Sequence, residues 1–209
     1  AEQHALTMAA GMAFAGMHPV VALYATFLNR AYDQLLMDVA MHRAPVTVVL
    51  DRAGITGADG ASHNGMWDIA MAAMIPGMCL AAPRDEATLR SQLRQAVAID
   101  DGPSLVRYRK GSMPAPIEAL ESLEGMDWLY RSHKQGAGKR VLLVAAGAMA
   151  EPMLAAAAQL EALGYVPDVI DPCWLLPINP ALVELTRGYD LVVSAEDGLV
   201  DGGFGSALR

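Results

Sequence analysis

The sequence has little cysteine and no excess of positive charge. It contains 2 cysteines in 209 residues, and Cys79 and Cys173 stand far apart, without the spacing of a metal site. We expect buried thiols of a cytoplasmic protein rather than a disulfide. The net charge of −8 argues against non-specific nucleic-acid binding, which needs a basic face. It does not exclude a small anionic substrate, because a few local cations outweigh the net charge.

Long apolar runs are also absent from the sequence. Charges, glycines or prolines interrupt every apolar stretch within about 18 residues, so we expect no membrane-spanning helix. No secretory signal is visible at the start. However, the first residue is Ala1 and Glu2 falls directly into a helical pattern, so we expect the natural N-terminus to be missing. Hydrophobic residues make up 54% of the chain, which suffices for a sizeable core.

Short β-branched runs alternate with longer helical stretches, as in repeated βα units. The strands are expected near 19–24, 46–50, 78–82, 105–108, 141–146, 166–170 and 190–195. The helices are expected near 4–17, 27–42, 66–74, 85–99, 151–163 and 180–187, the fourth capped by Asp85 and the fifth ended by Gly164. This pattern predicts an α/β fold of two three-layer domains with largely parallel sheets.

The segment 111–138 contains glycine, proline and acidic residues and has no sustained period. We therefore predict a first domain over 1–112, a linker over 113–138 and a second domain over 139–209. A short hairpin or strand is expected in the linker around Trp128–Arg131. The first domain is expected to lack its N-terminal part and the second its C-terminal part.

Ligands bind at the carboxyl ends of strands in parallel sheets, and the richest such segment is the loop 51–65. It holds four glycines, two aspartates, one arginine and one histidine. His63 can move a proton near neutral pH, and Arg52 can hold a phosphate. The alternative is a mobile surface loop with a solvated histidine. We favour a functional loop, because long ordered loops in compact domains usually have a function.

The segment 24–30 follows the first predicted strand. Thr26 is a candidate helix cap. Tyr24 and Phe27 form either an aromatic wall, with Arg30 one turn further on, or ordinary core packing. Residue preferences alone favour core packing.

Other charged residues are ambiguous on composition alone. Arg107, Arg109 and Lys110 at a strand end indicate either a phosphate site or a solvated basic turn. Glu2 fits an acid at a helix start, favoured by the helix dipole. The pair 196–197 and the glycine-rich turn 202–205 lack a phosphate-loop fingerprint, so we interpret them as a turn. Neither metal-ligand spacing nor a nucleophile elbow is present.

Several stretches together resemble the 1-deoxy-D-xylulose-5-phosphate synthase family, thiamine-diphosphate-dependent enzymes of the transketolase type. The stretches that resemble its pyrimidine-binding domain are AEQHALTMAAGMA, YATFLNRAYDQLLMDVA, DRAGITGADGASHNGMWD, APRDE and DGPSLVRYRKG. VLLVAAGAMAEP and VVSAEDGLVDGGFGSALR resemble its C-terminal domain. The DRAG…GADG…SHNG loop is the most particular to this family, whereas the first two stretches also occur, in looser form, across transketolase-like enzymes.

The resemblance implies an enzyme, a transferase that condenses pyruvate with D-glyceraldehyde 3-phosphate and releases CO2. Its product, 1-deoxy-D-xylulose 5-phosphate, is a precursor of isoprenoids (terpenoids), thiamine and pyridoxal. The implied cofactors are thiamine diphosphate and Mg²⁺, and the complete enzyme is expected to be a cytoplasmic homodimer. The family holds the diphosphate and the metal through a GDG-type motif in an N-terminal domain, which this sequence lacks. We therefore expect this chain alone to be inactive.

Carried over residue by residue, the resemblance also implies roles at the cofactor. Glu2 matches the acid that hydrogen-bonds the aminopyrimidine ring and promotes its proton exchange. Phe27 matches the aromatic residue that stacks on this ring, and Tyr24 matches its neighbour in the wall of the site. Arg30 matches an arginine close to the ring.

The remaining implied roles concern the substrates. Asp59 and His63 match polar residues that face the reacting carbon, with His63 as a proton donor or acceptor. Arg52 matches an arginine that contacts the aldehyde's phosphate. Lys110 stands where many members have a second phosphate-binding arginine, and it keeps the charge but loses the bidentate fork. Arg109 is the alternative for this contact.

Two other functions stay open. One is another transketolase-like enzyme, such as a 2-oxo acid dehydrogenase beta subunit or a transketolase, and the loop 51–65 argues against it. The other is a non-catalytic module, because a fold alone does not establish a function. The joint presence of the candidate site residues argues against this second alternative.

Overall fold

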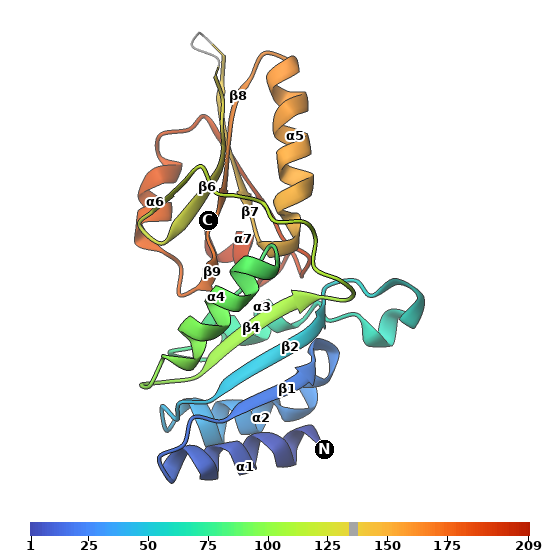
Figure 1. The fold of residues 1–209 in the computed structure, drawn as a ribbon, viewed down its shortest axis with the longest axis vertical. Helices are drawn as coiled ribbons and strands as arrows, with labels where there is room; N and C mark the ends of the chain where they lie inside the picture. Colours follow the sequence, from blue (N-terminus) through green and yellow to red (C-terminus); the bar gives the residue numbers. More distant parts are fainter. Residues whose placement is uncertain (134–137) are drawn as a thin grey trace.

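The computed structural model describes residues 1–133 and 138–209, so part of the predicted linker, 134–137, lies outside the described residues. Two sheets follow one another along the long axis of the molecule (Figure 1). The first has the order β1-β2-β4-β3-β9. Its strands are β1 (Val20–Tyr24), β2 (Thr47–Ala53), β4 (Ser104–Arg109), β3 (Cys79–Ala81) and β9 (Trp174–Leu176). All pairs are parallel except that of β3 with β9.

The second sheet has the order β10-β7-β8-β6-β5. Its strands are β10 (Leu191–Ala195), β7 (Arg140–Ala145), β8 (Val166–Asp171), β6 (Met126–Arg131) and β5 (Glu121–Leu123). The first three are parallel, whereas β6 and β5 form an antiparallel hairpin at the edge. Its turn uses positive φ at Glu124 and Gly125, as a tight hairpin requires. The predicted hairpin is confirmed, and the α/β class with largely parallel sheets is confirmed too.

Helices cover both sheets. In the first domain they are α1 (Glu2–Phe14), α2 (Tyr32–Gln34), α3 (Asp68–Ala73) and α4 (Glu86–Val97), and in the second α5 (Ala150–Ala162), α6 (Pro180–Thr186) and α7 (Phe204–Ala207). α5 and α6 lie on opposite sides of the second sheet (Figure 1). The predicted helix over 27–42 is divided, since a 3-10 segment (Ala25–Ala31) precedes α2 and a π segment (Leu35–Ala40) follows it.

Two predicted helix ends are confirmed and one is wrong. The Asp85 carboxylate accepts the Thr88 N–H at 2.8 Å at the start of α4, and Gly164 follows α5 with φ of +93°. Thr26 caps no helix, because its hydroxyl instead donates to the Ser62 carbonyl at 2.9 Å.

The two domains share the largest buried cluster, and one strand from the second part of the chain joins the first sheet. A single buried cluster extends from Leu6 on α1 to Ile170 on β8 and Phe204 on α7. β9 follows β8 in the chain, yet it pairs with β3 of the first sheet, with Leu80 opposite Leu176. This three-residue strand has no periodicity that would predict it from the sequence.

A buried arginine reinforces this junction. Arg84 follows β3 and its side chain is 5% exposed. Its Nη1 lies 2.6 Å from Asp127 on β6 and 2.9 Å from Asp171 on β8. Burial raises the pKa of Asp171 to about 6, even though Arg84 donates to it. A guanidinium in the first domain is therefore neutralised by carboxylates of the second sheet.

Two simpler expectations concern cysteines and membranes. Both Cys79 and Cys173 are free and partly buried, and burial raises the pKa of each thiol, so the predicted thiols are confirmed. Within the described part of the chain, no helix is both long and apolar enough to cross a membrane.

Replacing Arg84 by methionine should strongly destabilise the fold, because it leaves buried carboxylates without a counter-charge. We expect a loss of about 3–5 kcal/mol in the free energy of unfolding, measured by urea denaturation. The control is Arg43→Met, since the Arg43–Asp101 pair is 72% and 71% exposed. The control substitution should lower the free energy of unfolding by about 0–1 kcal/mol. Equal losses in both variants would contradict a structural role for the buried pair.

Candidate functional site

The candidate site lies at one edge of the first sheet. The carboxyl ends of β1, β2 and β4 face this edge, and the N-terminal end of α1 lies there too (Figure 1). The predicted loop 51–65 is shorter than expected, because β2 continues to Ala53 through its pairing with β1 and β4. Asp51 and Arg52 are thus strand residues, and the loop proper is 54–65.

Two glycines close the 54–65 loop at its neck. Gly54 and Gly65 each donate an N–H to the other's carbonyl at 2.8 Å. Inside the loop, the Asn64 side chain accepts the backbone N–H of Thr56 at 3.0 Å and its hydroxyl at 3.1 Å. Two short 3-10 turns, Gly57–Asp59 and Ala61–His63, complete the loop. These bonds give the loop a defined shape rather than that of an untethered surface segment.

Aromatic and cationic side chains form a row beside this loop. The rings of Tyr24 and Phe27 are stacked, 5.9 Å apart with an interplanar angle of 14°. The Arg52 guanidinium lies 4.1 Å from the centre of the Tyr24 ring, and that of Arg30 lies 5.5 Å from the Phe27 ring. His63 meets the Phe27 ring edge-on at 6.0 Å. The core-packing interpretation is wrong for Tyr24, which is 36% exposed.

Asp59 lies between two cations. Its Oδ1 is 2.7 Å from Lys110 Nζ, and its Oδ2 is 3.5 Å from Arg52 Nη1. The hydrogen bond from Lys110 lowers the pKa of Asp59, and the charges of Lys110, Arg52 and His63 lower it further. Three residues that are far apart in the sequence thus meet at one point, and an incoming anion could replace the carboxylate between the cations.

The cations of the strand end 107–110 differ in their surroundings. Arg107 is no phosphate ligand, since its side chain is 3% exposed and bonds to Asp68 at 2.7 Å and Asp197 at 2.5 Å. Arg109 is exposed, and no ion pair is described for it. Arg109 and Lys110 both line a cleft of about 580 Å³ that also contains residues of the second domain. The sequence does not identify Asp68 or Asp197 as a partner of Arg107, because nothing local indicates a contact between residues so far apart in the chain.

Glu2 and His63 complete the candidate residues. Glu2 is the first residue of α1 and its side chain is 21% exposed, with the carboxylate 3.7 Å from the amine of Ala1. No hydrogen bond between Glu2 and the aromatic row is described. The Nδ1 of His63 lies 3.0 Å from the hydroxyl of Ser62, which leaves the other ring nitrogen available for a substrate.

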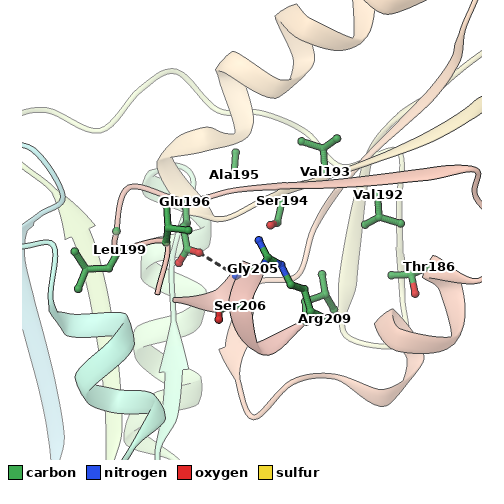
Figure 2. A pocket seen from close by; sticks show the side chains of 13 residues that line it. Thr186, Val192, Val193, Ser194, Ala195, Glu196, Leu199, Gly205, Ser206 and Arg209 are labelled. Carbon is green, nitrogen blue, oxygen red and sulfur yellow. Dashed lines mark hydrogen bonds between the residues drawn. The ribbon is translucent and has the colours of Figure 1, made fainter. Parts of the chain in front are cut away.

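The glycine-rich segment 202–205 forms a turn that runs into the start of α7, as predicted. It borders a hollow of about 560 Å³ beside β10 and α7 (Figure 2). The Glu196 carboxylate accepts the N–H groups of Phe204 at 2.8 Å and Gly205 at 2.9 Å. Since a carboxylate already occupies the start of this helix, a phosphate would be repelled there. Among the described residues, no group of three or more His, Cys, Asp or Glu side chains is arranged to hold a metal ion.

Two family descriptions match the chain. "Transketolase, pyrimidine binding domain" matches residues 1–116, and "Transketolase, C-terminal domain" matches residues 131–209. The chain is 57% identical over 210 residues to the 1-deoxy-D-xylulose-5-phosphate synthase of Arthrobacter sp. (strain FB24). It is 58% identical over 210 residues to that of Pseudarthrobacter chlorophenolicus. Both alignments cover 100% of this chain and 32% of the relative, so the chain spans about a third of these curated relatives.

Solved structures of transketolases have a similar fold. A split-gene transketolase, described as an inactive beta4 tetramer, superposes with a TM-score of 0.84 at 32% identity. That match covers 100% of this chain and 67% of the other. Transketolase from Campylobacter jejuni gives a TM-score of 0.76 at 18% identity, over 93% of this chain and 34% of the other, which shows the shared fold alone.

Replacing Lys110 by methionine should raise the pKa of Asp59 toward its ordinary value, because the dominant hydrogen bond is lost. A depressed folded-state pKa stabilises the fold above the unfolded pKa, and that contribution is lost as the pH falls through the folded value. The variant should therefore lack most of this stabilising contribution above the unfolded pKa, and its stability should change less as the pH falls. An NMR titration of the Asp59 carboxyl carbon measures the shift, with Arg109→Met as the control that should leave it unchanged.

Proposed function

The chain belongs to the transketolase family, and from this membership we propose that it forms part of a 1-deoxy-D-xylulose-5-phosphate synthase. The longer enzyme would condense pyruvate with D-glyceraldehyde 3-phosphate, with loss of CO2. One observation carries the proposal above all: Asp59 lies between Lys110 and Arg52, beside His63 and the aromatic row. This arrangement combines an anion site with a proton-transfer group and a flat ring surface.

The residues at the sheet edge fit the pyrimidine end of thiamine diphosphate. When bound, this cofactor supplies the electron sink for the loss of CO2 from a 2-oxo acid. Phe27 would stack against the pyrimidine ring, with Tyr24 and Arg30 supporting that surface. Glu2, at the same edge, would hydrogen-bond the ring and hold its proton. Residues outside this chain would hold the diphosphate and Mg²⁺.

The cations fit the phosphate of the aldehyde. Arg52 offers a planar fork that matches a phosphate, and Lys110 offers a point charge. The substrate's phosphate would replace the Asp59 carboxylate between them and release it toward the reacting carbon. Arg109 is the alternative second cation, since it is exposed at the cleft that Lys110 also lines.

His63 would exchange the proton of the aldehyde oxygen during carbon–carbon bond formation. The Ser62 hydroxyl lies 3.0 Å from Nδ1 of the His63 ring and can donate to it or accept from it, so either tautomer keeps this contact. The edge-on contact with Phe27 places this ring next to the proposed pyrimidine surface. The acid–base group His63 and the cofactor's pyrimidine ring would therefore lie next to each other at the carboxyl ends of β1 and β2.

We propose that the complete enzyme is a cytoplasmic homodimer whose product feeds isoprenoid and thiamine biosynthesis. The chain alone should be inactive, and the similar split-gene protein, described as an inactive beta4 tetramer, supports this. The main alternative is another transketolase-like enzyme. A non-catalytic module is less compatible with an assembled set of aromatic, cationic and acid–base side chains.

The proposal predicts that the 209-residue chain forms no product from pyruvate and D-glyceraldehyde 3-phosphate, whereas the longer protein that carries it does. Product is measured by mass spectrometry after addition of thiamine diphosphate and Mg²⁺. Sugar-phosphate ketol donors in place of pyruvate form the comparison. Turnover with these donors and none with pyruvate would make the protein a transketolase.

Replacing Glu2 by alanine in the longer protein should lower kcat about 10²–10⁴-fold, the usual contribution of an acid–base group. The control is Glu86→Ala, because Glu86 is 61% exposed and lies on α4. Unaltered turnover in Glu2→Ala would remove Glu2 from the catalytic assignment.

A further inference from the structure

We propose that Asp197, a residue of the second domain, is a positioning residue for the 54–65 loop of the first domain. The inference rests on the proposed function, since this loop carries Asp59 and His63. It assigns a role in the reaction to the C-terminal domain, whose other described residues near the site line the cleft beside Arg109 and Lys110. The role is exerted through contacts at the base of the site rather than through the substrate.

The first contact joins Asp197 to β4. Arg107 Nη1 lies 2.5 Å from Asp197 Oδ1, and Nη2 donates to the Asp197 carbonyl at 3.2 Å. On its other side, Arg107 Nε donates to Asp68 at 2.7 Å. The carboxylates of Asp68 and Asp197 outweigh the burial of Arg107 and keep its pKa above the ordinary value. Asp197 therefore holds the strand that leads directly into Lys110.

The second contact joins Asp197 to the neck of the loop. Gly54 has φ of +77°, and a Cβ placed on it would collide with the Asp197 carboxylate. Gly54 is also one of the two residues that close the loop, through its paired hydrogen bonds with Gly65 at 2.8 Å. Only a glycine accommodates both the left-handed backbone and this close approach.

The Asp197 carboxylate thus contacts both β4, through Arg107, and the neck of the loop, at Gly54. Lys110 follows β4 directly, and Asp59 lies within the loop. Lys110 Nζ and Asp59 Oδ1 are 2.7 Å apart. If the Asp197 side chain is truncated, the guanidinium of Arg107 stays buried with Asp68 as its one remaining carboxylate partner. Gly54 then loses the side chain against which it packs. The strand end and the neck then move independently, which displaces Asp59 and His63 from their cationic and aromatic neighbours.

The chain offers a matched control in Asp127. Asp127 and Asp197 are 15% and 14% exposed, and each binds an arginine of the first domain that is 5% or 3% exposed. Each arginine also binds a second carboxylate that is fully buried, Asp171 or Asp68. The Arg84 cluster, however, has no described contact with the 54–65 loop. Asp127→Ala therefore tests the loss of an interdomain ion pair without the loss of loop positioning.

The experiment compares Asp197→Ala and Asp127→Ala in the longer protein. Both variants should show similar falls in melting temperature. Only Asp197→Ala should lower kcat/KM for the aldehyde phosphate, by about 10–100-fold, the usual effect of a misplaced catalytic group. Hydrogen–deuterium exchange of the peptide covering 54–65 should rise in that variant alone.

Three outcomes are decisive. A selective loss of kcat/KM together with faster exchange in the loop supports the positioning role. Equal kcat/KM in the two variants, or unchanged exchange in the loop of Asp197→Ala, overturns it. If the unsubstituted protein makes no product, the proposed function fails instead, and the exchange comparison still decides whether Asp197 holds the loop.

Discussion

The burial of two guanidinium groups at the junction of the two domains constrains the whole structure. A buried arginine must be paired with carboxylates, because an unpaired charge away from water is very costly. Arg84 and Arg107 both belong to the first domain, and both pair with carboxylates from the second-domain side of the junction, Arg84 with two and Arg107 with one. The relative placement of the domains is therefore set by charge pairing as well as by the shared apolar core.

The site at the sheet edge follows from this constraint. Parallel strands bring their carboxyl ends to one edge, and the same edge receives the 54–65 loop and the start of α1. Asp59 pairs with both Arg52 and Lys110, and the Asp51 carboxylate lies 3.5 Å from Arg52 as well, so carboxylates hold both cations in place. A phosphate group would then exchange one set of ionic bonds for another, which limits the desolvation cost of binding.

Much of the fold could be predicted from the sequence, because most strands are continuous apolar runs, and because α4 and α6 begin at residues whose side chains cap them. Asp85 illustrates this, since its capping role depends only on the residues that follow it. Features with distant partners could not be predicted in this way. Arg107 looks like a surface cation until Asp68 and Asp197 surround it, and β9 has too few residues to show a pattern.

The candidate site was predictable in a different sense. The resemblance to a family supplied the residues, while spacing alone left Glu2 and the aromatic pair ambiguous. The meeting of Arg52, Asp59 and Lys110 depends on the register of β2 and β4, which no local pattern encodes. The contribution of Asp197 is less visible still, because it comes from another domain.

The pairing of β9 with the first sheet has a consequence for how the two domains can be separated. Leu80 and Ala81 on β3 hydrogen-bond to a strand that belongs, by chain order, to the second domain. A first domain separated at the linker would therefore lose β9, the strand that pairs with β3 at that edge of its sheet. It would present an unpaired strand edge, the kind of surface on which chains add to one another and aggregate. The boundary of the folding unit thus differs from the boundary that the order of the chain suggests.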